Sequence, residues 1–158
     1  MKKAVSLTDA VGFHLDPQRS FGYLLREASR TMMRALGDRI ERHDVTLGQY
    51  FILRELWEED GLTQRELSTR IGILEPSTVA ALDAMEKRGL IERRRSVEDR
   101  RKTHIMLTPK SKRLRTVLLR YAAEVNALAL KGVSSAQIRQ VREVLQRVRA
   151  NLTAHPEE

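Results

Sequence analysis

Residues 61–109 read GLTQRELSTRIGILEPSTVAALDAMEKRGLIERRRSVEDRRKTHIMLTP, and this stretch decides the fold. Thr63 and Glu66 have the spacing of a capping box, in which each side chain can bind a backbone amide of the other residue. A helix is therefore expected to begin after Thr63. Gly72 can adopt the left-handed conformation that ends a helix and turns the chain. The first part of the stretch thus predicts one short helix and a tight turn.

The middle of the stretch predicts a second helix. Pro76 suits its first turn, because the amide hydrogen that proline lacks would have no partner there. Gly89 is a typical residue just past a helix end. The apolar side chains expected to face inward are Val79, Leu82 and Met85.

The end of the stretch predicts a β-hairpin. Residues 90–95 and 103–108 have apolar positions compatible with strands, and residues 96–102 have the polar composition of a turn. Two short helices followed by such a hairpin form a winged helix-turn-helix, which places one helix in the DNA major groove. The alternative, a helical hairpin inside any all-α domain, leaves the strands unexplained.

Charge points to the same partner. The segment from Arg93 to Arg115 holds ten lysines and arginines but only two acidic residues, whereas the remainder of the +8 chain is balanced. A basic surplus confined to one segment favours binding to a polyanion, although a solvated loop would also carry such charges. No Phe, Trp or Tyr lies between Trp57 and Tyr121 to stack on RNA bases. Duplex DNA is therefore favoured, and a basic protein that binds RNA, or DNA without sequence specificity, is the alternative.

The wing carries a family resemblance. Asp99-Arg100-Arg101, followed by Ile-Met-Leu-Thr at 105–108, resembles the D-x-R, strand, L-T pattern of the MarR family of bacterial transcriptional regulators. Residues 85–91, MEKRGLI, are similar to the end of that family's recognition helix. The likeness is strongest over residues 46–118 and extends elsewhere as a pattern of helices.

Three positions, in two parts of the chain, depart from the family pattern. Ser111 stands where a glycine is usual, which leaves the expected fold unchanged. Ala80 and Ala81 stand in turns where the family's recognition helix often carries an arginine, and this argues against a direct guanine contact from that part of the helix.

The resemblance implies a mainly α fold with a small β-wing, in one domain over residues 1–158. The winged-helix core is expected at about 46–108, and dimerisation helices at about 16–42 and 109–153. The implied function is that of a homodimeric repressor, which binds a pseudo-palindromic operator and is released by a small molecule.

Roles in DNA binding are expected for three parts of the core. Ser77 and Thr78 are expected nearest the bases, with Pro76 setting the entry of the helix. Thr63 and Gln64 are placed to hold phosphates at the start of the preceding helix.

In the wing, the tip formed by Arg100, Arg101 and Lys102 is expected to reach the minor groove. The family pattern implies that Asp99 braces Arg101 and does not touch DNA. General phosphate contacts are expected from Arg93, Arg94 and Arg95, one of which could instead pair with Glu92 or Glu98.

The flanking helices have apolar stripes at helical spacing. Their expected starts are Asp16-Pro17, Thr46 with Gln49 as a capping box, Thr108-Pro109, and Ser134 with Gln137. Each stripe could fold back on the monomer. We favour packing across a two-fold axis, because helices that flank a compact DNA-binding unit have little core of their own to cover.

Other function classes are disfavoured by missing motifs. The chain has no cysteine, so it has no disulfide framework and no thiol redox switch. The four histidines, at 14, 43, 104 and 155, lack metal-ligand spacing, and glycine-rich phosphate loops and nucleophile motifs are absent. We expect no enzyme, metal or cofactor. With no apparent signal peptide and no membrane-length apolar run, the cytoplasm is the expected location.

The effector is the least constrained expectation. MarR-like regulators commonly bind small, often aromatic or anionic, compounds between the dimer helices and the DNA-binding lobe. The matching residues here are Phe13, His14, Tyr23, Arg26, Tyr50, Arg54 and Trp57. An arginine or histidine beside aromatic rings suits a carboxylate on a ring. Alternatively, Tyr50 and Trp57 belong to the core, and Arg26 and Arg54 form surface ion pairs.

Overall fold

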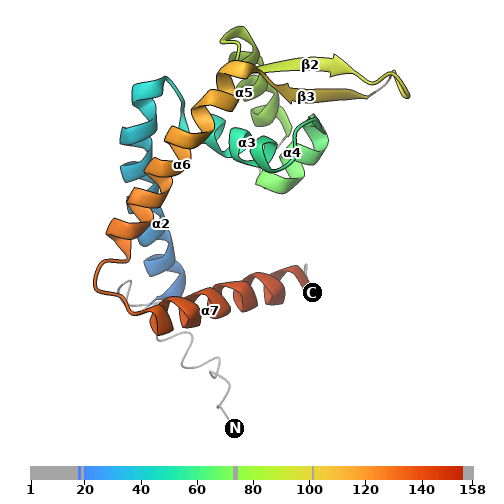
Figure 1. Cartoon of the computed structure of the whole chain (residues 1–158). Helices are drawn as coiled ribbons and strands as arrows, with labels where there is room; N and C mark the ends of the chain where they lie inside the picture. Colours follow the sequence, from blue (N-terminus) through green and yellow to red (C-terminus); the bar gives the residue numbers. More distant parts are fainter. Residues whose placement is uncertain (1–17, 19, 73–74, 101, 155–158) are drawn as a thin grey trace. The chain divides into compact units, whose positions relative to one another are not determined.

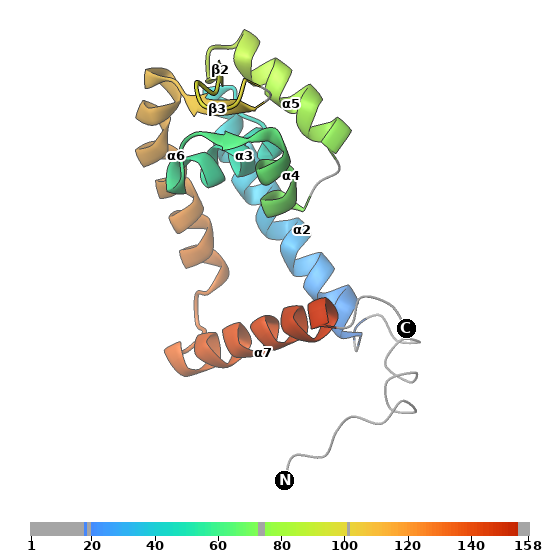
Figure 2. The ribbon, with the colours of Figure 1, turned by 90° about the vertical axis from the view of Figure 1, so that its right-hand side faces the viewer.

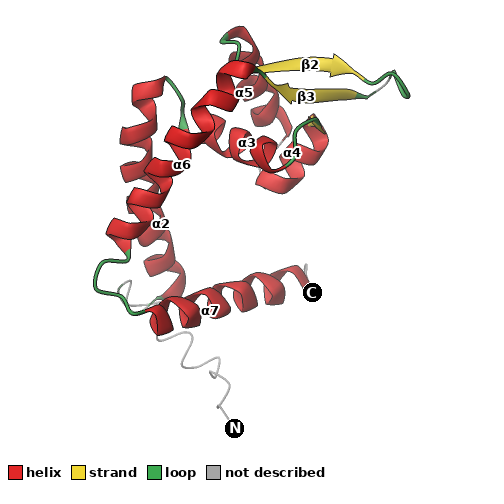
Figure 3. Ribbon diagram, in the orientation of Figure 1, coloured by secondary structure: helices red, strands yellow, loops and turns green. Residues whose placement is uncertain are grey.

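The computed structural model describes residues 18, 20–72, 75–100 and 102–154. The elements in chain order (Figure 1) are α2 (Phe21–Ile40), the short 3-10 helix η1 (Glu41–His43), α3 (Leu47–Glu58), β1 (Leu62–Thr63), α4 (Gln64–Ile71), α5 (Glu75–Lys87), β2 (Ile91–Arg95), β3 (Thr103–Leu107), α6 (Pro109–Ala129) and α7 (Ser135–Ala154). Helices dominate the described chain, as Figure 3 shows. The chain divides into two compact units, one up to Val125 and one from Asn126 onward.

The first unit is built around three helices and a small sheet. Helix α3 packs on α4 and α5, and α5 packs on β2, which Figure 2 shows with the wing seen from its tip. The side chains that are almost fully buried between them include Leu53, Leu56, Leu67, Leu82, Met85 and Ile105. This arrangement confirms the predicted helix-turn-helix followed by a wing.

The wing is a three-stranded antiparallel sheet with the order β1-β3-β2. Ile91 pairs with Leu107 and Arg95 with Thr103, so the predicted hairpin is confirmed. Strand β1, which pairs Leu62 with Ile105, was not predicted. Two residues are too short a run to show the alternation by which a strand is recognised in a sequence.

The predicted capping boxes set the helix starts. Both reciprocal hydrogen bonds are present at the starts of α3 and α4, with Thr46 and Thr63 as N-caps. Ser134 and Gln137 form the same pair before α7. Gly72 ends α4 with a φ of 71°, in the left-handed region as expected. Helix α2 is capped by Ser20, while the predicted start at Asp16-Pro17 lies outside the described residues.

Several apolar faces of the flanking helices are not covered within their own unit. In α2, Phe21 and Leu24 are each 50% exposed, while Leu36 and Ile40 nearer its end join the core. Helix α7 has no buried residue. Within the described part of the chain, no helix is long and apolar enough to span a membrane. The division into a single domain over the whole chain remains a prediction.

Candidate nucleic-acid interface

The inward face of α5 starts one residue earlier than the sequence suggested. Thr78 is only 2% exposed, and it lies on the same inward face as Leu82 and Met85, which are both fully buried. Val79, in contrast, is 36% exposed. The prediction that Val79 faces the core is therefore wrong. Thr78 takes the inward position, and its predicted place nearest the bases remains a prediction. The side chains of threonine and valine are both β-branched and nearly the same size, so threonine can fill an inward position. A pattern of apolar residues alone assigned that position to the neighbouring valine.

The outward face of α5 is small and mostly uncharged in its first two turns. Pro76 is the second residue of the helix, as predicted, and Ser77, Val79 and Ala80 are exposed beside it. Of the two residues predicted nearest the bases, Ser77 is the exposed one. The backbone of α5 can therefore approach another surface closely.

Arg93 joins the wing to α5. Its guanidinium lies 2.6 Å from a carboxylate oxygen of Asp83 and also binds Glu86, and its backbone N–H donates to Glu86 at 3.2 Å. Partial burial lowers the pKa of Arg93, but the hydrogen bonds to the two carboxylates outweigh this effect, and the net shift is upward. Arg93 was predicted to contact a phosphate; in the structure its guanidinium is held by two carboxylates of α5, and the phosphate contact remains a prediction.

The next two arginines of β2 differ from Arg93. Arg94 pairs with Glu92 on the same strand, which is one of the pairings left open by the sequence. Arg95 is exposed and has no ion-pair partner among the described residues. Arg95 is thus the arginine of this strand best placed to meet a phosphate.

The tip of the wing is a closed turn. Ser96 N–H donates to the Lys102 carbonyl at 2.9 Å, and Lys102 N–H donates to the Asp99 carbonyl at 2.8 Å. The backbone N–H of Asp99 donates to the Ser96 hydroxyl at 3.2 Å. Arg100 and Lys102 are exposed at this turn, while Arg101, and with it the predicted bracing by Asp99, lies outside the described residues.

The N-terminus of α4 is already occupied by a carboxylate. Both the N–H and the hydroxyl of Thr63 donate to Glu66 Oε2 at 2.7 Å. The hydrogen bond from the Thr63 amide, followed by that from its hydroxyl, lowers the pKa of Glu66. Thr63 was predicted to hold a phosphate; in the structure both of its donors bind the Glu66 carboxylate, and the phosphate contact remains a prediction. Gln64 is half-buried, and Arg65 next to it is exposed. Arg65 was not among the predicted site residues, although a cation at the start of this helix could meet a phosphate.

Comparisons with known proteins identify the family. A model of the MarR family matches residues 45–103. The solved structure of the transcriptional regulator PA3341 is 34% identical, covers 85% of this chain and 99% of its own, and superposes with a TM-score of 0.78. The chain belongs to the MarR family. The resemblance stated from the wing pattern is confirmed.

Two of the proteins that the chain resembles are named as repressors. The transcriptional repressor CouR, solved on a 23-mer DNA duplex, is 30% identical with a TM-score of 0.71 over 86% of this chain and 94% of CouR. The homoprotocatechuate degradative operon repressor of Escherichia coli is 35% identical over 89 residues, which are 56% of this chain and 58% of that repressor. The matches span about half to two thirds of the length of several curated relatives.

The residues predicted to bind an effector differ in their burial where the structure describes them. Tyr50 and Trp57 are buried in the core, where the indole N–H of Trp57 donates to the Ser111 carbonyl at 3.2 Å. This is the core alternative that the sequence left open. The exposed residues of the set are Tyr23, Arg26 and Arg54, while Phe13 and His14 lie outside the described residues.

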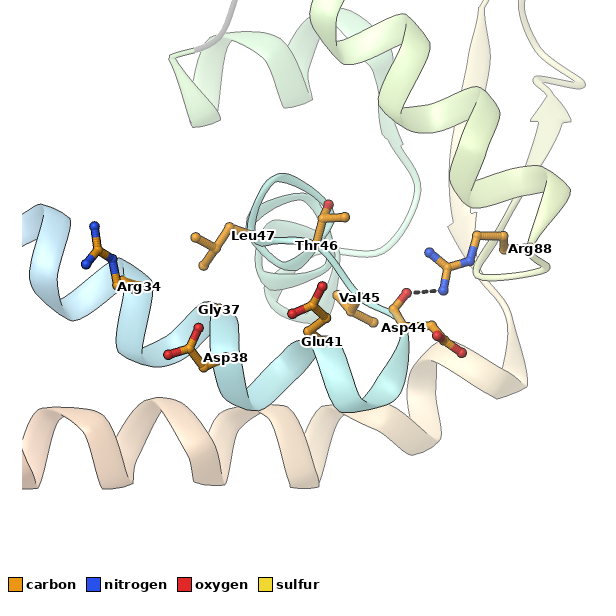
Figure 4. A pocket seen from close by; sticks show the side chains of 9 residues that line it. All are labelled: Arg34, Gly37, Asp38, Glu41, Asp44, Val45, Thr46, Leu47 and Arg88. Carbon is orange, nitrogen blue, oxygen red and sulfur yellow. Dashed lines mark hydrogen bonds between the residues drawn. The ribbon is translucent and has the colours of Figure 1, made fainter.

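A cavity of about 790 Å³ lies elsewhere, between the end of α2, the start of α3 and the residue after α5 (Figure 4). Its lining consists of Arg34, Gly37, Asp38, Glu41, Asp44, Val45, Thr46, Leu47 and Arg88. The Arg88 guanidinium donates to the Asp44 carbonyl and, at 3.2 Å, to the side-chain oxygen of Gln49. The cavity wall is thus bonded to the end of α5. No sequence pattern indicated this cavity, because Arg88 meets the other lining residues, all within 34–47, only in the folded chain.

Proposed function

We propose that this MarR-family chain is a transcriptional repressor that binds a specific duplex DNA site. The observation that carries the proposal is the exposed, short-chained face of α5 beside a wing whose tip carries Arg100 and Lys102. A helix of this kind enters the major groove, and a basic wing tip suits the negative potential of the minor groove. Support also comes from the DNA-bound repressor CouR, which shares the fold at 30% identity.

The contacts are divided among these elements. Ser77 lies nearest the bases, with Pro76 setting the entry of the helix. Arg100, Arg101 and Lys102 enter the minor groove, and Asp99 braces Arg101. Phosphates are held by Gln64 and Arg65 at the start of α4 and by Arg95 in the wing.

The repressor acts as a homodimer on a pseudo-palindromic operator. Support comes from apolar residues that are 36–56% exposed: Phe21, Leu24 and Leu25 in α2, and Val141, Val144 and Leu145 in α7. Contiguous exposed apolar patches mark interaction surfaces. A two-fold dimer presents two copies of α5 about one helical turn of DNA apart, at roughly 34 Å.

A small molecule, aromatic or anionic in character, releases the DNA. Two locations are candidates: the exposed surface around Tyr23, Arg26 and Arg54, and the cavity beside Arg88. The cavity is connected to the recognition helix through Arg88, the residue that follows α5. The Arg88 guanidinium donates to the Asp44 carbonyl in the cavity wall and to Gln49 in α3. An effector releases DNA only if it binds the non-binding conformation more tightly than the DNA-competent one.

These locations are separated by titrating the DNA complex with a panel of aromatic acids. If the surface is the site, Arg26→Ala and Arg54→Ala blunt the response while DNA binding without effector is kept. If the cavity is the site, Arg34→Ala blunts it and the other two variants respond like the wild type. If none of the compounds shifts DNA binding, release by aromatic acids is wrong.

The proposal of sequence-specific binding is tested against the alternative of non-specific nucleic-acid binding. Duplexes are selected from a random pool by repeated rounds of binding, and the dissociation constant of the selected duplex is compared with that of a scrambled duplex and of single-stranded RNA. We expect a two-fold symmetric consensus and at least a thousandfold preference for it. Equal affinity for all three nucleic acids would overturn the proposal.

A further inference from the structure

The first turns of α5 lack the side chains that usually read guanine and adenine. Residues 75–84, EPSTVAALDA, contain no arginine, lysine, asparagine or glutamine. Bidentate hydrogen bonds from these residue types are the common way of reading guanine or adenine in the major groove. The N-terminal residues of a recognition helix are those that contact base edges, so this helix must read bases in another way.

The carboxylates near the middle of α5 are already bound within the protein. Asp83 and Glu86 both bind the Arg93 guanidinium, and Glu86 accepts the Arg93 backbone N–H as well. A carboxylate reads cytosine by accepting a hydrogen bond from its amino group. Asp83 and Glu86 would have to give up their arginine partner to do so. The one other acidic residue of this helix is Glu75, at its start.

The groups that remain exposed are apolar or very small. Val79 is 36% exposed although its β-branched neighbour Thr78 is buried, so of these two side chains the helix presents the valine methyl groups outward. Ala80 is exposed next to Val79. The 5-methyl group of thymine is the one apolar feature of base edges in the major groove, and side chains such as alanine contact it.

We infer that α5 recognises thymine methyl groups, through Val79 and Ala80, so that each operator half-site carries T·A pairs under the start of this helix. The inference rests on the proposed function and names the bases that its recognition helix selects. The wing agrees with it, because narrow minor grooves of A·T-rich DNA attract arginine, and Arg100 is exposed at the wing tip.

The test uses the duplex selected from the random pool. Each thymine of the selected half-site is replaced by deoxyuridine, one at a time, which removes only the methyl group. We expect one or more positions at which the dissociation constant rises about fourfold, the equivalent of about 0.8 kcal/mol for one methyl-sized group. At the position that Val79 contacts, Val79→Ala should reduce the difference between thymine and uracil, because the substitution removes the two outer methyl groups of the valine.

A matched control is available in the same chain. Val97 is 98% exposed in the wing turn, so Val97→Ala makes the same chemical change away from α5 and should keep the full thymine preference. Thermal unfolding of both variants checks that the fold is kept.

Two outcomes overturn the inference while leaving sequence-specific binding intact. One is a consensus whose thymines can all be replaced by uracil with less than a 1.5-fold change. The other is a consensus dominated by cytosine that depends on Glu75, shown by loss of that preference in Glu75→Gln. A selection that yields no consensus at all would instead overturn the proposed function itself.

Discussion

Replacing Arg93 with alanine removes the bridge between the wing and the recognition helix. The Arg93 side chain is 26% exposed, and its two partners, Asp83 and Glu86, are more exposed than it is. Pairs of this exposure contribute about 0.2–1 kcal/mol each, so the two together are worth roughly 0.4–2 kcal/mol. We expect the free energy of unfolding to fall by that amount in urea denaturation at pH 7.

The matched control for this measurement is Arg94→Ala. Arg94 is 65% exposed and pairs with Glu92 two residues away on the same strand. Its removal should cost no more than about 0.5 kcal/mol, because a local pair on the surface is weak and screened by salt.

Measurements of operator affinity can distinguish an Arg93 that bridges the wing and α5 from an Arg93 that contacts a DNA phosphate directly. In Arg93→Ala, the Asp83 and Glu86 carboxylates face the DNA without their counter-charge, so operator affinity should fall. Arg93→Ala combined with Asp83→Asn has the wild-type net charge and should recover most of the affinity. If Arg93 instead holds a phosphate, the double variant stays weak, and the slope of log K against log salt concentration decreases in magnitude by about 0.9. That result would refute the bridging role.

Three further predictions concern the wing tip, the dimer and acid stability. Arg101→Ala should weaken operator binding by roughly 1–3 kcal/mol in a folded protein if it makes a close groove contact, and unchanged affinity at moderate salt would contradict the minor-groove role. Leu145→Glu places a charge on the apolar stripe of α7, where burial of an unpaired charge is costly, so sedimentation should show monomer; an intact dimer would mean that this stripe packs elsewhere. The pKa of Glu66 is lowered, so its contribution to stability is complete above the unfolded-state pKa and is lost as the pH falls through the folded-state value. Urea unfolding at several pH values should therefore show that the free energy of unfolding falls more steeply with acid for the wild type than for Glu66→Gln. If the free energies of the two proteins fall in parallel, the capping role of the charge is contradicted.

Local patterns in the sequence were enough to predict the elements of the DNA-binding core. The capping boxes at Thr46 and Thr63 depend on residues three apart, and the hairpin depends on two short apolar runs around a polar turn. Each of these signals is complete within a few residues, so no knowledge of the tertiary fold is needed to recognise it.

The errors arose where tertiary contacts decide. Arg93 looked like one of three equivalent arginines, but only its position opposite α5 brings it to Asp83. The Thr78 and Val79 faces were exchanged because their shapes are alike. The cavity beside Arg88 joins residues more than forty positions apart, such as Asp44 and Arg88, and no spacing rule reaches across that separation.

The lack of buried side chains in α7 has a consequence for how the protein behaves on dilution. A helix of 20 residues has little stability by itself in water, and its capping pair at Ser134 and Gln137 contributes only a small part of what it needs. Whatever covers its apolar stripe must supply the remainder. By mass action, the order of this segment then depends on the concentration of that partner. If that partner is a second copy of this chain, as proposed above, the cellular amount of the protein sets how much of it is fully folded and able to bind DNA.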